Sequence, residues 1–133
     1  MMGFMVKRTV LTHPWLHLLA LLSVALFPYG WLANHSTAFA WLVDLVFHTE
    51  LAHTIGHFSL FALLGAALLL ALPRLRRRPR LFLALILLFG IAQEMLQLLT
   101  FKHRFVTWVD VYDLAVDLLG ASVTFVYWRK LSR

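Results

Sequence analysis

Ionisable and amide side chains recur at helical spacing in three separate stretches of the sequence. Residues three or four apart share one face of a helix, so each set forms a polar stripe. The stripes are Glu50, His53 and His57; Glu94 and Gln97; and Asp110, Asp113 and Asp117, with Gly120 following at the same spacing. An imidazole beside carboxylates supports general acid–base catalysis, and the same groups ligate metal ions. The spacing therefore indicates acid–base or metal-ligand chemistry if the three stripes meet.

The composition predicts that lipid surrounds the elements that carry these stripes. Apolar residues make up 62% of the 133 residues, and the mean hydropathy is +0.81. Soluble domains are about 45–50% apolar, and a soluble domain of this size could not bury so much apolar surface. We therefore expect one all-α, polytopic membrane domain that covers residues 1–133.

Four apolar runs reach the length of about 20 residues that a helix needs to cross a bilayer. They cover approximately residues 14–33, 51–73, 81–101 and 109–128. Helices rise about 1.5 Å per residue, which places the central residues of the stripes roughly 6–12 Å below the outer ends of their spans. We therefore predict four transmembrane helices with one polar pocket between the second, third and fourth.

The basic residues predict the orientation of these spans. Lys7 and Arg8 precede the first span, five arginines join the second to the third, and Arg129, Lys130 and Arg133 follow the fourth. Alternating spans place these ten of the twelve basic residues on one side, which the positive-inside rule makes cytoplasmic. We expect a multi-pass protein of the cytoplasmic membrane with both termini in the cytoplasm.

Two N-terminal segments have alternative interpretations. The first span follows basic residues as a signal peptide does, but its apolar run exceeds the about 7–15 residues of a signal core, so we interpret it as a retained span. In the first outer loop, residues 36–48 alternate apolar and polar side chains. This pattern predicts a short interfacial helix with Trp31 and Trp41 as anchors, and a packed outer loop is the alternative.

The polar residues also follow the order of a known family. In chain order they are His53-Thr54-Ile55-Gly56-His57, then Glu94-Met95-Leu96-Gln97, then Arg104, and last the set Asp110, Asp113, Asp117 and Gly120 within residues 110–120. In this order and spacing, over about residues 50–125, the chain resembles the VanZ-like family of small membrane proteins. It departs from the family pattern at His53-Thr54, where Asp-Lys is usual, and at Asp117, where Asn is usual. A role that depends on that lysine, such as phosphate binding, is therefore not carried over.

The resemblance implies a link to lower susceptibility to teicoplanin-type, lipid-tailed glycopeptides, or to envelope physiology, without specifying a reaction. The first hypothesis is accordingly a pocket that binds a membrane lipid or a lipid-linked envelope precursor, or a lipid-tailed glycopeptide. Arg104 would offer a donor fork at the mouth of this pocket. His53, Gln97, Asp110 and Asp117 are the other predicted ligand-binding residues.

Two further hypotheses use the same side chains. An intramembrane hydrolase or transferase would use His57 as base, with Glu94 or Asp113 as its orienting group or acid, on a lipid phosphate or ester. A divalent metal site would use His53, His57, Glu94 and Asp113, a ligand set that suits zinc, manganese or iron. A network that only holds helices together is the structural alternative.

The sequence also excludes several classes of function. The basic residues fall in short clusters between apolar runs and not on one folded face, so we expect no nucleic-acid partner. The chain has no cysteine, which excludes disulfides and thiol nucleophiles. The inner segments 62–72 and 81–88 are wholly apolar and offer no continuous ion path. The oligomeric state, including a homo-oligomer, stays open.

Overall fold

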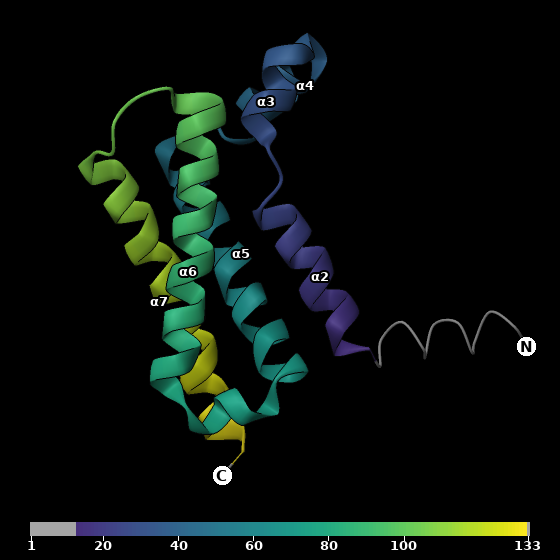
Figure 1. Ribbon diagram of the computed structural model, residues 1–133, viewed down its shortest axis with the longest axis vertical. Helices are drawn as coiled ribbons and strands as arrows, with labels where there is room; N and C mark the ends of the chain where they lie inside the picture. Colours follow the sequence, from purple (N-terminus) through teal and green to yellow (C-terminus); the bar gives the residue numbers. More distant parts are fainter. Residues whose placement is uncertain (1–12, 133) are drawn as a thin grey trace, which may run out of the picture.

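The chain folds into helices only, over residues 13–132, the part that the computed structural model describes (Figure 1). The helices are α2 (Pro14–Ala25), α3 (Tyr29–His35), α4 (Thr37–Val46), α5 (Glu50–Ala71), the 3₁₀-helix η1 (Pro73–Arg77), α6 (Pro79–Gln97), the π-helix η2 (Leu98–Lys102) and α7 (Trp108–Leu131). The all-α prediction is therefore confirmed. Lys7, Arg8 and Arg133, which contribute to the predicted orientation, lie outside the described residues.

Two or three membrane spans meet the requirements of length and apolar composition. α5 qualifies, as does α6 continued by η2, and α2 with α3 qualifies only if this bent pair counts as one span. α7 is 24 residues long and carries the three aspartates of its stripe on its buried face. The membrane character of the chain is thus supported for two helices and a bent pair.

The first predicted span, residues 14–33, is broken and not continuous. α2 begins at Pro14, as expected, because a proline at a helix start loses no hydrogen bond. Pro28 interrupts the chain before α3, since a proline disfavours helical conformation in the residue before it. α3 is bent by 53° from α2. A side chain at Gly30 would collide with Thr100, so α3 packs closely against η2.

A short helix forms within residues 36–48, as predicted. The hydroxyl of Ser36 accepts a hydrogen bond from the backbone N–H of Phe39 and caps α4. The location of α4 at a membrane interface stays a prediction.

α5 and α7 approach each other most closely through small residues. A Cβ at Gly120 would collide with the carbonyl oxygen of Phe58, and Gly65 packs against Ala121. Thr124 Oγ1 donates a hydrogen bond to the carbonyl oxygen of Ala62 at 3.0 Å. The adjoining apolar core is fully buried and includes Phe61, Leu64, Leu68, Leu69, Phe82 and Ile86. Small residues therefore let the two helices, and the stripes they carry, lie in contact.

The two ends of the bundle differ in charge. The basic end comprises η1 and the C-terminal turn of α7, and Arg76 lies over the ring of Trp128 with 4.7 Å to the centroid. Pro73 and Pro79 begin η1 and α6, so the basic turn is tight, as the sequence predicts. The polar end comprises the N-terminal parts of α5 and α7, the C-terminal part of α6, and η2. The functional candidates lie at the polar end.

Candidate functional site

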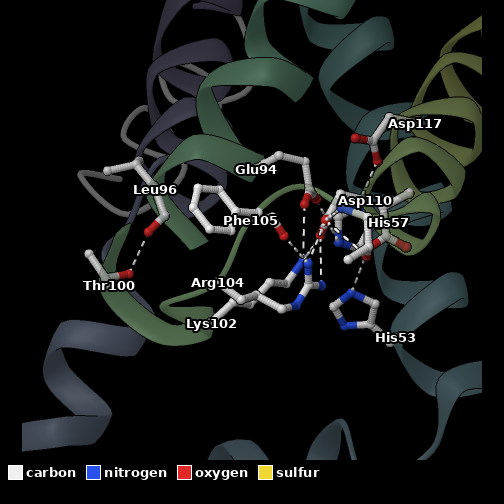
Figure 2. Close-up of polar contacts among 12 residues, drawn as sticks. His53, His57, Glu94, Leu96, Thr100, Lys102, Arg104, Phe105, Asp110 and Asp117 are labelled. Atoms are coloured by element: carbon white, nitrogen blue, oxygen red, sulfur yellow. Dashed lines mark hydrogen bonds and ion pairs between the residues drawn. The ribbon is translucent and has the colours of Figure 1, made fainter. Parts of the chain in front are cut away.

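The stripes of α5 and α7 face each other at the polar end (Figure 2). His57 Nδ1 lies 2.8 Å from Asp117 Oδ1, and the two side chains are 5% and 1% exposed. One turn nearer the end, His53 Nε2 lies 3.4 Å from Asp113 Oδ2. The centroids of the two histidine rings are 4.6 Å apart. Two histidines of α5 are therefore in register with two aspartates of α7.

Glu94 brings α6 into the same cluster (Figure 2). Its Oε1 lies 4.0 Å from His57 Nε2, which is beyond hydrogen-bond length. Its Oε2 accepts a hydrogen bond from Lys102 Nζ at 3.1 Å, and Lys102 also donates to Asp110 Oδ1 at 2.6 Å. Lys102 thus bridges α6 and α7. We call these eight side chains the polar cluster: His53, His57, Glu94, Lys102, Arg104, Asp110, Asp113 and Asp117.

Asp110 is both a helix cap and the partner of two cations. It forms a capping box with Thr107, whose backbone N–H donates to Asp110 Oδ2 at 2.7 Å. Arg104 donates to both oxygens of this carboxylate, at 2.7 and 3.1 Å. The Asp110 carboxylate holds the pKa of Arg104 above its ordinary value, so the guanidinium stays charged. The Arg104 guanidinium, which the sequence predicts to bind a ligand, thus binds the Asp110 carboxylate.

The turn after η2 delivers Lys102 to the cluster. η2 is a π-helix, and His103 beyond it has φ 44°, in the left-handed region that non-glycine residues seldom occupy. Only 14% of the Lys102 side chain is exposed, so its ammonium lies within the protein. Sequence reasoning assigns Lys102 no place in the candidate site and misses this role. Residues 103–107 separate Lys102 from α7, so helical periodicity gives no signal for its contact with Asp110.

Three buried oxygens around the cluster have no hydrogen-bond partner among the described residues: Gln93 Oε1, Glu94 Oε1 and Asp117 Oδ2. Buried polar atoms in native proteins are nearly always paired, with protein, water or ligand. Among residues 13–132, the four buried carboxylates face two permanent cations, Lys102 and Arg104, which leaves two negative charges if all four carboxylates are ionised and both histidines are neutral. The cluster therefore has unused acceptors and excess negative charge.

Two hollows adjoin the cluster. The amphipathic cavity has a volume of about 480 Å³ and lies among α2, α3, α4, α5, α6 and η2. Its polar lining includes His53, His57, Gln93 and Gln97, together with Asp44 and Thr100, and its apolar wall includes Val24, Phe27, Leu60, Leu96 and Phe101. The outer groove, of about 740 Å³, runs between the N-terminal parts of α5 and α7 and reaches Asp113. His53 contributes to both hollows, so it lies between them.

Most of the predicted site residues thus come together, and one of them, Gln97, lies apart. Gln97 lines the amphipathic cavity beside Gln93, which the sequence-based site set omits. Glu50, which belongs to the α5 stripe but not to the predicted site set, lies in the outer groove and is exposed. The other predicted residues belong to the polar cluster.

Three of the clustered residues could hold a metal ion. His53, His57 and Asp113 each offer one ligand atom, and these atoms lie within 4.8 Å of one another. Glu94 of the predicted ligand set lies next to this group through its 4.0 Å approach to His57. The arrangement can therefore serve as a base–acid pair, a ligand-binding wall or a metal site.

Comparison with protein-family models, curated proteins and solved structures finds no match to this chain. The resemblance to the VanZ-like family thus stays a prediction from the motifs.

Proposed function

We propose that this chain is a four-span membrane protein that binds a lipid or a lipid-linked envelope molecule. The polar head of that molecule would contact His53, His57, Gln93 and Gln97, and its tail would fill the apolar part of the amphipathic cavity. The observation that supports this proposal is the cavity itself, which joins polar and apolar walls in one volume of about 480 Å³. Small-molecule sites commonly have this size and this mixture of walls.

The four proposed spans are α2 with α3, α5, α6 with η2, and α7. The three aspartates make α7 the most polar of these, but each is at most 2% exposed. The outward side of α7 is apolar, with exposed Leu119, Val123 and Val126. Lipid would therefore contact an apolar surface along this helix, while the bundle interior holds the charges. In this arrangement the basic end faces the cytoplasm and the polar end faces outward.

The head-group wall suits a polar ligand rich in hydrogen-bonding atoms. Gln93 Oε1 is buried and has no hydrogen-bond partner within residues 13–132, so it can accept a hydrogen bond from a ligand hydroxyl or amide. The histidine rings add donors or acceptors according to their tautomers. The VanZ-like resemblance favours the same class of ligand, namely a lipid-linked envelope precursor or a lipid-tailed glycopeptide of the teicoplanin type. A role in resistance to such compounds or in envelope physiology would follow from sequestration of the ligand.

The second candidate function is hydrolysis of a lipid phosphate or ester. The observation that favours it is the hydrogen-bonded pair of His57 Nδ1 and Asp117 Oδ1, because a carboxylate on one ring nitrogen orients the other for proton transfer. His57 would take a proton from a water molecule that attacks the substrate. Asp117, which the sequence assigns to ligand binding, would orient the imidazole in place of Glu94 or Asp113.

The experiment that tests the binding proposal blocks the tail cavity. In lipid nanodiscs, we would measure retention of a radiolabelled prenyl phosphate and of a teicoplanin-type lipoglycopeptide. Leu96→Trp adds a ring to the cavity wall and should reduce binding at least about tenfold, since the tail loses its volume. Leu88→Trp on the exposed side of α6 is the matched control and should bind normally.

The two candidate functions give different results in this assay. No retention of either probe by the unsubstituted protein, or equal retention by Leu96→Trp, would contradict the binding proposal. A product released from the prenyl phosphate, and lost in His57→Gln, would favour the hydrolase. Retention of a probe by the unsubstituted protein, reduced in His57→Gln and with no product from any variant, would favour the binder.

A further inference from the structure

We propose that His53, His57 and Asp113 bind one divalent transition-metal ion of the zinc class, and that Asp117 positions His57 for this role. This proposal concerns the polar cluster alone and does not depend on a ligand in the amphipathic cavity. Two imidazoles and one carboxylate are a donor set that suits zinc, iron or manganese and leaves a coordination position open.

The spacing of the donor atoms favours a single ion. In a tetrahedral zinc site with bonds of about 2.0–2.1 Å, ligand atoms lie about 3.3 Å apart. His53 Nε2 and Asp113 Oδ2 already lie 3.4 Å apart. All three donor atoms lie within 4.8 Å of one another, so rotations of the side chains would bring them to bonding distance. His53 and His57 are four residues apart on α5, the spacing that lets two histidines on one helix ligate the same ion.

Asp117 gives His57 the orientation that a metal ligand needs. Its Oδ1 lies 2.8 Å from His57 Nδ1, so His57 donates from Nδ1 and keeps the Nε2 lone pair for a metal. Histidines that ligate metals almost always donate their other ring N–H to a carboxylate, a carbonyl or a water. Asp117 is 1% exposed and cannot exchange this contact readily for solvent. It therefore acts as a positioning residue behind the ligand.

Glu94 provides a second, independent observation that points to a bound group. Its side chain is 5% exposed, and Oε1 has no hydrogen-bond partner among the described residues. Lys102 holds the other oxygen, and Oε1 then lies 4.0 Å from His57 Nε2 (Figure 2). This oxygen is directed at the place where the ion would sit. It would accept a hydrogen bond from a water molecule in the fourth position.

The excess charge of the cluster fits a divalent cation. Two uncompensated negative charges in a buried site are costly and must be balanced by protons or by a bound cation. Protonation of both histidines would place two like charges on rings whose centroids are 4.6 Å apart, which is unfavourable. One divalent ion supplies the same charge and also binds the Nε2 atoms. The excess charge is therefore compatible with the divalent ion that the geometry favours.

The test uses the full-length chain without a histidine tag, purified in detergent, stripped with a chelator and titrated with Co²⁺. We expect about one Co²⁺ per chain, displaced by Zn²⁺, with the visible absorption of a four- or five-coordinate ion. His53→Ala should lose this absorption, and because His53 is partly exposed the variant should keep its fold. Asp117→Asn should bind the same amount about 10–100-fold more weakly.

Matched controls separate this site from adventitious binding. His48→Ala alters an exposed histidine near the start of α5 and should bind Co²⁺ normally. Elution volume and helicity of the metal-free variants check that they fold, and the isosteric Asp113→Asn is a second ligand variant. Less than about 0.1 equivalent of Co²⁺ on the unsubstituted chain, or full binding by both His53→Ala and Asp113→Asn, would overturn the metal site. An unchanged affinity in Asp117→Asn would overturn its positioning role.

Discussion

The contact between α5 and α7 has two halves, which consist of different kinds of side chain. Toward the basic end, the helices meet through glycine, alanine and large apolar residues, and Phe61, Leu64 and Phe82 are completely buried. Toward the polar end, the same helices meet through His53 and His57 on one side and Asp113 and Asp117 on the other. One half is closely packed, and the other holds buried acceptor atoms that have no hydrogen-bond partner in the described part of the chain.

This difference separates what holds the helices together from what can bind a ligand. In lipid, helix association depends on close packing, and polar contacts contribute only about 0.6 kcal/mol each on average. The apolar half therefore suffices to bring the helices together. The polar half adds buried charge that such small gains do not offset, which is why we assign it a function. Each of the following substitutions tests one half against the other.

The largest effect is expected where the helix backbones touch. Gly120→Leu would place a side chain against the carbonyl of Phe58, and it should destabilise the folded state by more than about 3 kcal/mol because α7 must move away from α5. Thermal unfolding in detergent, followed by circular dichroism, measures the loss. Ala115→Leu on the exposed side of α7 is the control and should unfold near the temperature of the unsubstituted protein. Equal stability of both variants would contradict this close contact.

A smaller loss of stability is expected at the polar end, from substitution of Asp110, the ion-pair partner of Lys102. Asp110→Asn removes the negative charge that Lys102 and Arg104 share, and it weakens the cap of α7. Breaking a buried ion pair costs about 3–5 kcal/mol, and solvent at Arg104, which is 36% exposed, should reduce this to about 2–3 kcal/mol. The same unfolding assay applies. Glu50→Gln, in the first turn of α5, removes an exposed charge and should change stability little.

A result for Asp110→Asn as small as that for Glu50→Gln would mean that Lys102 is solvated, and the proposed sharing of charge would then be wrong. An effect that disappears in high salt would have the same meaning, because salt screens exposed pairs far more than buried ones.

The periodic features of this architecture could be predicted from the sequence. Hydropathy alone locates α5 and α6, and the spacing of three and four residues places His53 and His57 on the face that meets α7. Residues 36–48 contain a helix, as their alternation predicts. These predictions succeed because each depends on residues within one or two helical turns.

The non-periodic features could not be predicted in the same way. The 53° bend between α2 and α3 depends on Pro28 together with the packing of Gly30 on η2, which lies far away in sequence. The position of Lys102 depends on a π-helix and on the left-handed conformation of His103. The pairing of Asp117 with His57 in preference to Glu94 depends on helix rotation. These features are set by tertiary contacts that hydropathy does not encode.

The smallest effect is expected from the interhelical hydrogen bond of the apolar half. Thr124 Oγ1 donates to the carbonyl oxygen of Ala62, and also lies 3.3 Å from that of Gly120. Thr124→Val keeps the shape of the side chain and removes the donor, and both carbonyls stay bonded within their helices. The loss should therefore be about 0.6 kcal/mol, while Thr124→Ser, which keeps the hydroxyl, should restore most of it. If Thr124→Val instead costs more than about 2 kcal/mol, polar contacts hold both halves of the α5–α7 pair, and buried polarity alone would no longer distinguish the functional end.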